Sequence, residues 1–169
     1  MPEITIVHEL ECDEDTFFRE CVFGTEFNRT LYLDTLKFPA YQVLEDVDGA
    51  ERRTRKVRID PPVGGLPGPI KKVLGDRFGY VEEGTFDKKT KRYSFKVTPT
   101  TLAEKTKTVG DVWCEPLGDK RVKRLARILV EVKVFAIGGM IEDKILQDLR
   151  ASYDAAAKFT NEYLHAKGL

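Results

Sequence analysis

The sequence predicts an α+β fold in which an antiparallel sheet of seven strands packs against one long C-terminal helix. Residues 138–169 carry apolar side chains at helical spacing, whereas residues 41–135 alternate between apolar and polar side chains as strands do. A first strand at residues 3–10 and two short helical patterns precede this β-rich segment. Strands joined by short turns pair in antiparallel fashion, so the later strands need no crossover helix.

Length and charge limit the class of protein. A chain of 169 residues can form one domain, residues 1–169, with a substantial core. Its 28 basic and 28 acidic residues balance, so we expect no nucleic-acid partner. The N-terminal residues lack a basic segment followed by an apolar run, and no stretch approaches the roughly 18 apolar residues of a membrane span. We therefore expect a cytoplasmic protein.

The cysteines and histidines do not indicate a metal centre. Cys12, Cys21 and Cys114 are odd in number and irregularly spaced, which favours reduced thiols over disulfides. His8 and His165 are the only histidines, and neither belongs to a metal-binding motif. We expect no metal and no cofactor. A catalytic pair of a cysteine and a histidine stays open, although no motif supports it.

Alternation of apolar and polar side chains predicts the first strand. Ile4, Ile6, His8 and Leu10 would share its inner face. A histidine among apolar neighbours is more often a hydrogen-bonded core residue than a functional one. We therefore interpret His8 as structural, while a functional role remains the alternative.

Two short helices are predicted after this strand. Asp13 is a good N-cap for the first helix, which carries Phe17, Phe18, Cys21 and Val22 and ends at Gly24. Thr25 is expected to cap the second helix. That helix extends to about residue 37, because Phe38 and Pro39 break the pattern.

Three hairpins supply the other strands. Asp48-Gly49 is a strong two-residue turn signal, and polar segments at 87–90 and 118–119 separate the later pairs. Pro99 is expected to end the fifth strand. The last strand would place alternate apolar side chains from Val122 to Val134 on one face. The expected strands are residues 41–47, 51–59, 77–86, 91–97, 103–114 and 122–135.

The C-terminal helix is one-sided along its whole length. Its apolar face carries Ile141, Ile145, Leu146, Leu149, Tyr153, Ala156, Phe159, Tyr163 and Leu164, with charged side chains opposite. From residue 141 to residue 166 this helix would be about 39 Å long, as long as a small domain is wide. Such an apolar face needs a sheet to cover it.

This order of elements is that of a helix-grip fold, and the chain resembles the START-like superfamily of proteins that bind lipids and other hydrophobic ligands. That superfamily also holds plant pollen allergens and polyketide cyclases. The junction Val134-Phe135-Ala136-Ile137-Gly138-Gly139-Met140-Ile141-Glu142 resembles the strand-to-helix junction of a bacterial START-like family without an assigned function. That family is similar to the VASt sterol-transfer domains.

The resemblance implies a curved sheet whose long helix covers a cavity for a lipid, a sterol or another hydrophobic small molecule. An alternative is that the aromatic rings simply fill the core. Glu142 would either cap the helix or bind a ligand hydroxyl group. The candidate ligand-binding residues are Phe27, Leu31, Tyr41, Phe78, Tyr80, Tyr93, Phe95, Trp113, Ile128, Val130, Glu142, Ile145, Leu149 and Tyr153.

The segment 61–74 is too rich in proline and glycine for regular structure until a helical turn at 70–74. In lipid-transfer members of the superfamily such a loop covers the cavity mouth. Apolar side chains beside lysines would suit transient contact with an anionic membrane, and an ordinary surface loop is the alternative. The candidate membrane-contact residues are Val63, Leu66, Ile70, Lys71 and Lys72.

Two basic segments, residues 52–58 and 120–127, are interpreted mainly as solvated strand faces. Three function classes then remain. The sequence favours a carrier or sensor of a lipid or sterol. A cyclase or dehydratase would need an acid or base in the cavity, for which His8, Glu142 and Tyr153 are the candidates. A protein-interaction module with a filled cavity, as in co-chaperone relatives of the fold, is the third.

Overall fold

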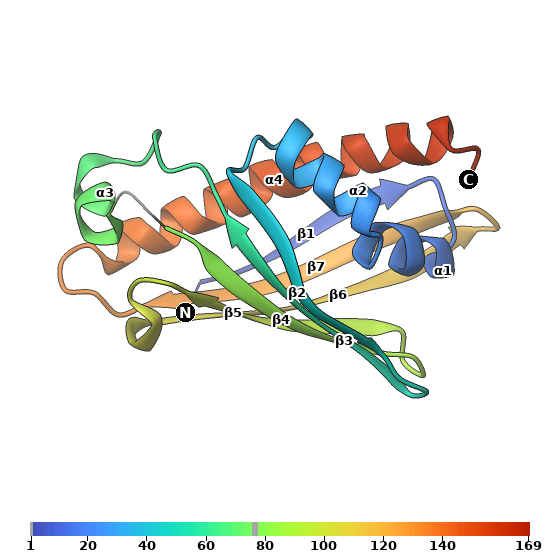
Figure 1. Ribbon diagram of the computed structural model, residues 1–169, viewed down its shortest axis with the longest axis horizontal. Helices are drawn as coiled ribbons and strands as arrows, with labels where there is room; N and C mark the ends of the chain where they lie inside the picture. The colour runs from blue at the N-terminus through green and yellow to red at the C-terminus, as the bar shows by residue number, and fades with distance from the viewer. Residues whose placement is uncertain (1, 76–77) are drawn as a thin grey trace.

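The computed structural model describes residues 2–75 and 78–169, and its body is an antiparallel sheet with the strand order β1-β7-β6-β5-β4-β3-β2 (Figure 1). The first strand therefore pairs with the last, and β1 and β2 form the two edges. This arrangement confirms the helix-grip fold expected from the sequence. The strands are β1 Glu3–Leu10, β2 Ala40–Asp48, β3 Arg52–Asp60, β4 Tyr80–Asp87, β5 Arg92–Pro99, β6 Thr106–Gly118 and β7 Arg121–Val132.

Two short helical units follow β1, as predicted. Each begins as an α-helix and continues with a π-helical segment: α1 Glu14–Thr16 with η1 Phe17–Val22, and α2 Thr25–Arg29 with η2 Thr30–Thr35. Asp13 caps α1, because its side chain accepts a hydrogen bond of 2.7 Å from the backbone N–H of Thr16. The remaining helices are α3 Gly68–Leu74, the 3-10 turn η3 Ala103–Lys105 and α4 Gly138–Ala166.

Some predicted boundaries were wrong. Thr25 is the first helical residue of α2, and Gly24 occupies the N-cap position instead. β5 extends two residues beyond its predicted end at Val97, and Pro99 is its last residue. Residues 103–105 form η3, so β6 begins only at Thr106. Arg77, expected at the start of the fourth strand, lies outside the described residues.

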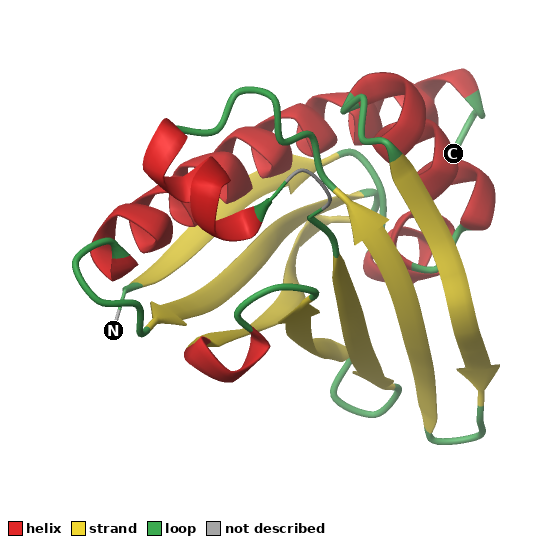
Figure 2. Cartoon of the chain, turned by 60° about the vertical axis from the view of Figure 1, so that its left-hand side comes forward, coloured by secondary structure: helices red, strands yellow, loops and turns green. Residues whose placement is uncertain are grey.

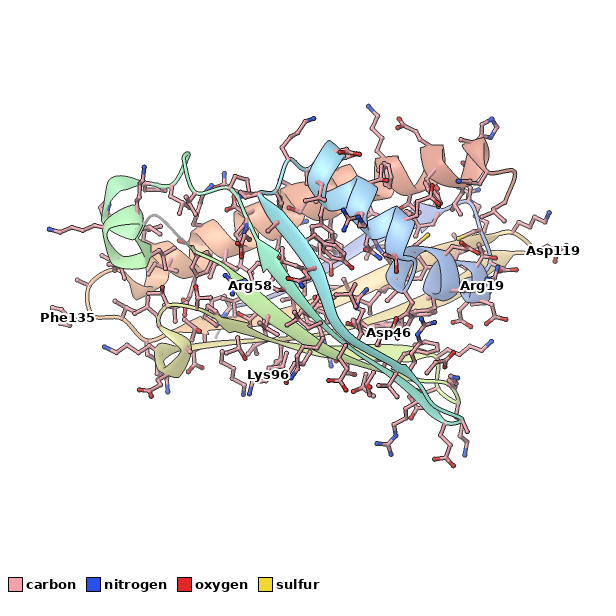
Figure 3. The ribbon with its side chains drawn as sticks, in the orientation of Figure 1. Arg19, Asp46, Arg58, Lys96, Asp119 and Phe135 are labelled. Carbon is pink, nitrogen blue, oxygen red and sulfur yellow. The ribbon has the colours of Figure 1, made fainter. Side chains whose placement is uncertain are left out.

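The junction after β7 also differs from the prediction. β7 ends at Val132 rather than Phe135, because Ala136 turns the chain with a positive φ of 69°. The side chain of Phe135 consequently projects from the connection and is 98% exposed (Figure 3). α4 begins two residues after the turn.

α4 lies along the concave side of the sheet and contacts β1, β7 and η2 (Figure 2). Its predicted apolar face is the buried one. Ile141, Ala157 and Leu164 are buried, and the other apolar side chains of this face pack on the core at partial exposure. Inward-facing residues of β1 and β7 form the opposing layer: Ile6, Leu10, Val122, Ala126, Ile128 and Val130. Periodicity in the sequence thus located both layers of the core.

The two short helical units are joined by one buried amide. The side-chain Nδ2 of Asn28 donates to the backbone oxygens of Cys21 at 2.9 Å, Val22 at 3.0 Å and Gly24 at 2.8 Å. The oxygens of Cys21 and Val22 belong to the C-terminal end of η1, where helices leave carbonyl groups without intrahelical partners, and Gly24 is the N-cap of α2. Asn28 therefore fixes the angle between the two units.

Replacing Asn28 with alanine should lower the free energy of unfolding by about 1–3 kcal/mol, since buried carbonyl groups lose their donor. Chemical denaturation followed by circular dichroism measures this change. Asn161→Ala is the matched control, because the hydrogen bonds of Asn161 to Glu11 and Glu9 lie at the surface. Equal destabilisation by the two substitutions would contradict the proposed joint.

Candidate functional site

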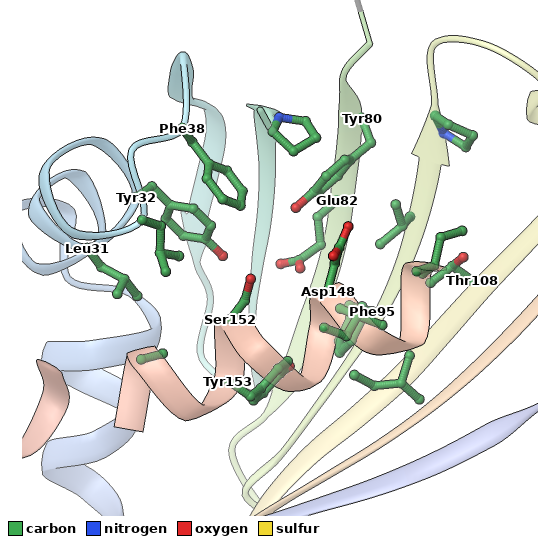
Figure 4. Close-up of a pocket in the computed structure, with 18 of the residues that line it drawn as sticks. Leu31, Tyr32, Phe38, Tyr80, Glu82, Phe95, Thr108, Asp148, Ser152 and Tyr153 are labelled. Carbon is green, nitrogen blue, oxygen red and sulfur yellow. The ribbon is translucent and has the colours of Figure 1, made fainter. Parts of the chain in front are cut away.

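A cavity of about 330 Å³ lies between the concave face of the sheet and α4. Its walls come from η1, α2, η2, strands β3 to β7, the segment 61–74 and α4. Figure 4 shows labelled side chains of η2, β4, β5, β6 and α4 around the open space. The sheet and the helix therefore do not close fully on each other.

Most of the lining is apolar. Two glycines make room for aromatic rings that cover the strands. A Cβ atom on Gly84 would lie 1.9 Å from the hydroxyl oxygen of Tyr93, and one on Gly110 would lie 2.5 Å from Cζ of Phe95. Both rings consequently lie flat against the sheet, where larger residues would push them into the cavity. An apolar cavity of this kind suits a hydrophobic ligand.

A buried ion pair forms one polar part of the wall. Nη2 of Arg55 lies 3.1 Å from Oε2 of Glu82, and the Tyr93 hydroxyl donates to the same oxygen at 2.9 Å. Nη1 of Arg55 donates to the backbone oxygen of Val22. Oε1 of Glu82 receives no hydrogen bond from any described residue. The carboxylate is thus held on one side and open on the other.

Burial and neighbouring groups together set the pKa values around this pair. Burial acts to lower the pKa of Arg55, but Tyr93 and Glu82 raise that pKa overall. Burial, followed by the nearby Glu82 carboxylate, raises the pKa of Tyr80 and of Tyr93. Both phenols therefore remain protonated donors at neutral pH, and Arg55 remains charged.

Further polar groups face the same space. Figure 4 shows the hydroxyl groups of Tyr32, Tyr80 and Ser152 directed toward the carboxylates of Glu82 and Asp148. Within the described chain, the Tyr32 and Tyr80 hydroxyls have no hydrogen-bond partner. The Asp148 side chain is 54% exposed and pairs with Lys144 at 2.7 Å. An apolar molecule with a hydroxyl or similar group would find both donors and acceptors here.

A second arginine, Arg124 of β7, also lines the cavity and is only 4% exposed. Its Nη2 lies 2.9 Å from Nδ1 of His8 and 3.5 Å from the backbone oxygen of Tyr153. The guanidinium also lies over the Tyr153 ring at 5.0 Å from the centroid. Nε2 of His8 is 2.7 Å from Oδ1 of Asp154. His8 is thus an inward-facing, hydrogen-bonded residue, as the structural interpretation expected.

The three cysteines are buried free thiols. Burial, followed by the charge of Asp13, raises the pKa of Cys12 to about 11. Burial, followed by the charge of Glu14, raises the pKa of Cys114 to about 12, and burial raises the pKa of Cys21 further. Such thiols are poor nucleophiles at neutral pH. The described residues contain no group of three or more His, Cys, Asp or Glu side chains placed to hold a metal ion.

The structure brings most of the predicted ligand-binding residues to the cavity. That they contact a ligand stays a prediction. The predicted residues that line the cavity are Phe27, Leu31, Phe78, Tyr80, Tyr93, Phe95, Ile128, Ile145, Leu149 and Tyr153.

Four predicted residues do not line the cavity. Tyr41 belongs to a separate cluster with Val57 and Ile59, where its ring stacks on Tyr32 at 4.9 Å. Trp113 faces the other side of the sheet from its buried neighbours Val112 and Cys114, and Arg92 lies 4.1 Å above its ring. Side chains alternate between the two faces of a strand, so the prediction that Trp113 points into the cavity was wrong.

The other two are structural. Val130 is fully buried in the layer beneath α4 rather than in the cavity wall. Oε2 of Glu142 accepts a hydrogen bond of 2.7 Å from the backbone N–H of Val132, the last residue of β7. Glu142 therefore ties the end of β7 to the first part of α4, which accounts for its position without a ligand.

The predicted membrane-contact loop lies with its apolar side chains inward. Val63, Leu66 and Ile70 line the cavity, and Ile70 is 1% exposed, so they form no exposed apolar tip. Lys71 and Lys72 are exposed on α3. Figures 1 and 2 place α3 beside the N-terminal half of α4. Among the described helices, none combines the length and apolarity that crossing a membrane requires.

Sequence reasoning missed the charged residues of the cavity. Arg55 and Arg124 belong to the segments interpreted as solvated strand faces, yet both are directed inward. The signal was present in the alternation of β7, where Arg124 falls between the inward-facing Val122 and Ala126. Glu82 similarly shares a face of β4 with Tyr80. A charged residue at a strand position that faces inward was therefore the feature of the sequence that could have identified these cavity residues.

Comparison with known proteins places the chain in a family. Residues 13–164 match the profile of the family described as "Protein of unknown function (DUF2505)". The chain belongs to this family. A search of curated proteins found no match to this DUF2505 chain.

Several solved structures share the fold of this DUF2505 chain. The protein TTHA0849 from Thermus thermophilus is 15% identical with a TM-score of 0.70, over 99% of this chain and 100% of that one. The Zhui aromatase/cyclase from Streptomyces sp. R1128 is 10% identical with a TM-score of 0.67, over 99% and 98%. A START superfamily protein from Mycobacterium smegmatis is 13% identical with a TM-score of 0.63, over 96% and 98%. These matches support the START-like fold, whereas the similarity to VASt domains is not confirmed.

Glu142→Ala should destabilise the protein by about 1–3 kcal/mol, because the part-buried N–H of Val132 loses its acceptor. Binding of a hydrophobic probe should not change, since Glu142 lies outside the cavity. Thermal unfolding and probe titration measure the two effects. Asp143→Ala, at the exposed neighbouring position, is the control. Weaker probe binding at unchanged stability would return Glu142 to the ligand site.

Stability should fall as the pH rises above about 9, the ordinary pKa of a free thiol. Below that pH the thiols are protonated in both the folded and the unfolded chain. Above it only the unfolded chain loses these protons, because burial raises the folded-state pKa values. We expect a loss of about 1 kcal/mol per thiol between about pH 8 and about pH 10. Urea titrations across this range, compared with a variant in which all three cysteines are alanine, measure the slope; equal slopes would contradict the assignment.

Proposed function

We propose that the protein binds an apolar small molecule carrying a polar group, and that the ligand occupies the cavity between the sheet and α4. The observation that supports this proposal is the cavity itself. Its volume of about 330 Å³ is lined mainly by apolar side chains, while Oε1 of Glu82 and the hydroxyls of Tyr32 and Tyr80 lack protein partners within the described chain. Unpartnered polar groups at an apolar site orient a ligand.

The apolar surface alone supports useful affinity. Burial of about 400 Å² of ligand surface at about 25 cal/mol per Å² contributes roughly 10 kcal/mol before the entropic cost of association is subtracted. A few hydrogen bonds then select among molecules of similar shape. The ligand is proposed to be a lipid, a sterol or a related hydrophobic compound.

A role in carrying or sensing such a ligand is the more specific part of the proposal. The START-like fold is compatible with it, although fold alone does not determine function. Contact with an anionic membrane through Lys71 and Lys72 stays a prediction. It would require Leu66 and Ile70 to leave the positions in which they line the cavity.

An enzymatic role has less support. Of the three candidate acids and bases, Tyr153 lines the cavity, His8 is engaged by Arg124 and Asp154, and Glu142 is bound to the backbone of Val132. Of these three groups, only Tyr153 lines the space in which a substrate could lie. A binding function needs no acid or base there.

Solvent extraction of the purified protein followed by mass spectrometry tests the proposal directly. Recovery of a stoichiometric hydrophobic compound would support binding. A neutral fluorescent probe, N-phenylnaphthylamine, should in addition bind to the emptied protein. Absence of both results would favour the third class, a protein-interaction module that takes no ligand.

Leu149→Trp tests the position of the ligand. Leu149 lines the cavity from the middle of α4, so the larger ring should occupy ligand space while overpacking costs about 1–3 kcal/mol at most. Binding of N-phenylnaphthylamine should weaken by about tenfold or more. Leu44→Trp is the matched control, because Leu44 is 48% exposed at the bulge of β2. Undiminished binding by the Leu149 variant would remove this residue from the site.

A further inference from the structure

Arg124 occupies an unusual position for a charged residue. The register of the sheet pairs it with His8 on β1 and with Cys114 on β6, so all three side chains lie in one row on the concave face. Its neighbours on the same face of β7 are the apolar residues Val122 and Ala126. The guanidinium is thereby removed from water but lines the cavity.

No carboxylate of the described residues forms an ion pair with Arg124. Arginine only donates hydrogen bonds, so Nδ1 of His8 must accept from its Nη2 across 2.9 Å. The proton of the neutral ring then lies on Nε2, which faces Asp154 at 2.7 Å. The carboxylate of Asp154 is consequently separated from Arg124 by a whole imidazole ring, and it is 63% exposed.

The hydrogen-bonding capacity of Arg124 is also incompletely used. Its Nε is buried and has no partner among the described residues. Besides His8, the remaining contacts are a long hydrogen bond of 3.5 Å to the backbone oxygen of Tyr153 and the face of the Tyr153 ring. A guanidinium that is buried without satisfied donors is strongly unfavourable. Nε of Arg55 is likewise unpartnered, so what distinguishes Arg124 is its uncompensated charge, which an anion on the cavity side of the guanidinium would compensate.

The other charged groups of the cavity do not supply that anion. Glu82 is paired with Arg55, and Asp148 is paired with Lys144. Burial lowers the pKa of Arg124, whereas the pKa of the paired Arg55 is raised. Once these two ion pairs are set aside, the guanidinium of Arg124 is the remaining buried charge among the described residues of the cavity, and it is positive.

We infer that the cavity ligand is an apolar monocarboxylic acid whose carboxylate binds the guanidinium of Arg124. This inference rests on the proposed ligand-binding function and narrows it to one chemical class. The two carboxylate oxygens can accept hydrogen bonds from the guanidinium in the forked arrangement that arginine favours. The apolar part of the acid would lie along Phe95, Ile128 and Leu149, which line the same cavity.

The first experiment uses the wild-type protein and compares acids with alcohols of the same carbon skeleton. Dodecanoic acid and dodecanol form an aliphatic pair, and naphthoic acid and naphthol form an aromatic pair. Displacement of N-phenylnaphthylamine gives each affinity. A charge-assisted, forked pair in a dry site should favour the acid by at least about tenfold in one of the two pairs, which also identifies the skeleton.

The outcomes separate the two proposals. If both alcohols bind as tightly as their acids, the ligand-binding function stands and the carboxylate inference is wrong. If the probe does not bind, and none of the four compounds binds either, the ligand-binding function fails as well. Preference for an acid that persists at high salt supports a buried pair, because such pairs are screened little.

Substitution then assigns the preference to a residue. Arg124→Met keeps an extended side chain without charge, so acid binding should weaken by about tenfold or more while alcohol binding changes by less than about threefold. Arg124→Lys keeps the charge but loses the fork and should lie between the two; it also serves if the methionine variant does not fold. Arg127→Met is the matched control on the outer face of β7, where Arg127 faces Asp111 at 3.7 Å. Retained acid preference in both Arg124 variants would overturn the assignment.

Discussion

The guanidinium of Arg55 connects the sheet to the helices that cover one end of it. From β3 it donates to the last residue of η1, Val22, and to side chains on β4 and β5, namely Glu82 and Tyr93. It also lies near the rings of Phe23 and Tyr93, at 5.5 and 5.6 Å from their centroids. Buried ion pairs contribute little net stability unless their hydrogen bonds are satisfied, so the main consequence here is geometric. The network fixes Glu82 with one oxygen bound and the other directed to open space.

The two buried arginines of the cavity differ in a way that fold alone does not require. Arg55 has a carboxylate within hydrogen-bonding distance, whereas Arg124 has an imidazole. Both are nearly inaccessible to solvent, so bulk water cannot compensate either charge effectively. The same sheet therefore presents one neutralised polar patch and one charged patch to a space that is otherwise apolar. This asymmetry would give the proposed ligand a preferred orientation.

Much of the fold could be predicted from the sequence because periodicity and turn residues act locally. The alternation of residues 3–10 and the one-sided helix from Gly138 led to the observed elements. The Asp48-Gly49 signal located the hairpin of β2 and β3, although Asp48 belongs to β2 and the connection lies at residues 49–51. The candidate site was harder, because it depends on which strand face is inward and on whether side chains fill the space. Trp113 was misassigned by one position of the strand alternation. Arg124 was assigned to solvent because charge normally predicts exposure. Its hydrogen bond to His8 joins residues 116 positions apart in sequence, which local periodicity does not reveal.

The neighbours with known structures share this backbone at 10% to 15% identity, so the backbone cannot by itself specify a ligand. Specificity must then come from inward-facing side chains at strand positions where the fold accepts several residue types. On β4 these are Tyr80 and Glu82, and on β7 it is Arg124, which lies between Val122 and Ala126 on the inward face. A polar residue at such a position costs stability unless it is paired. The unpaired groups of this cavity are therefore the part of the sequence on which the proposed choice of ligand depends.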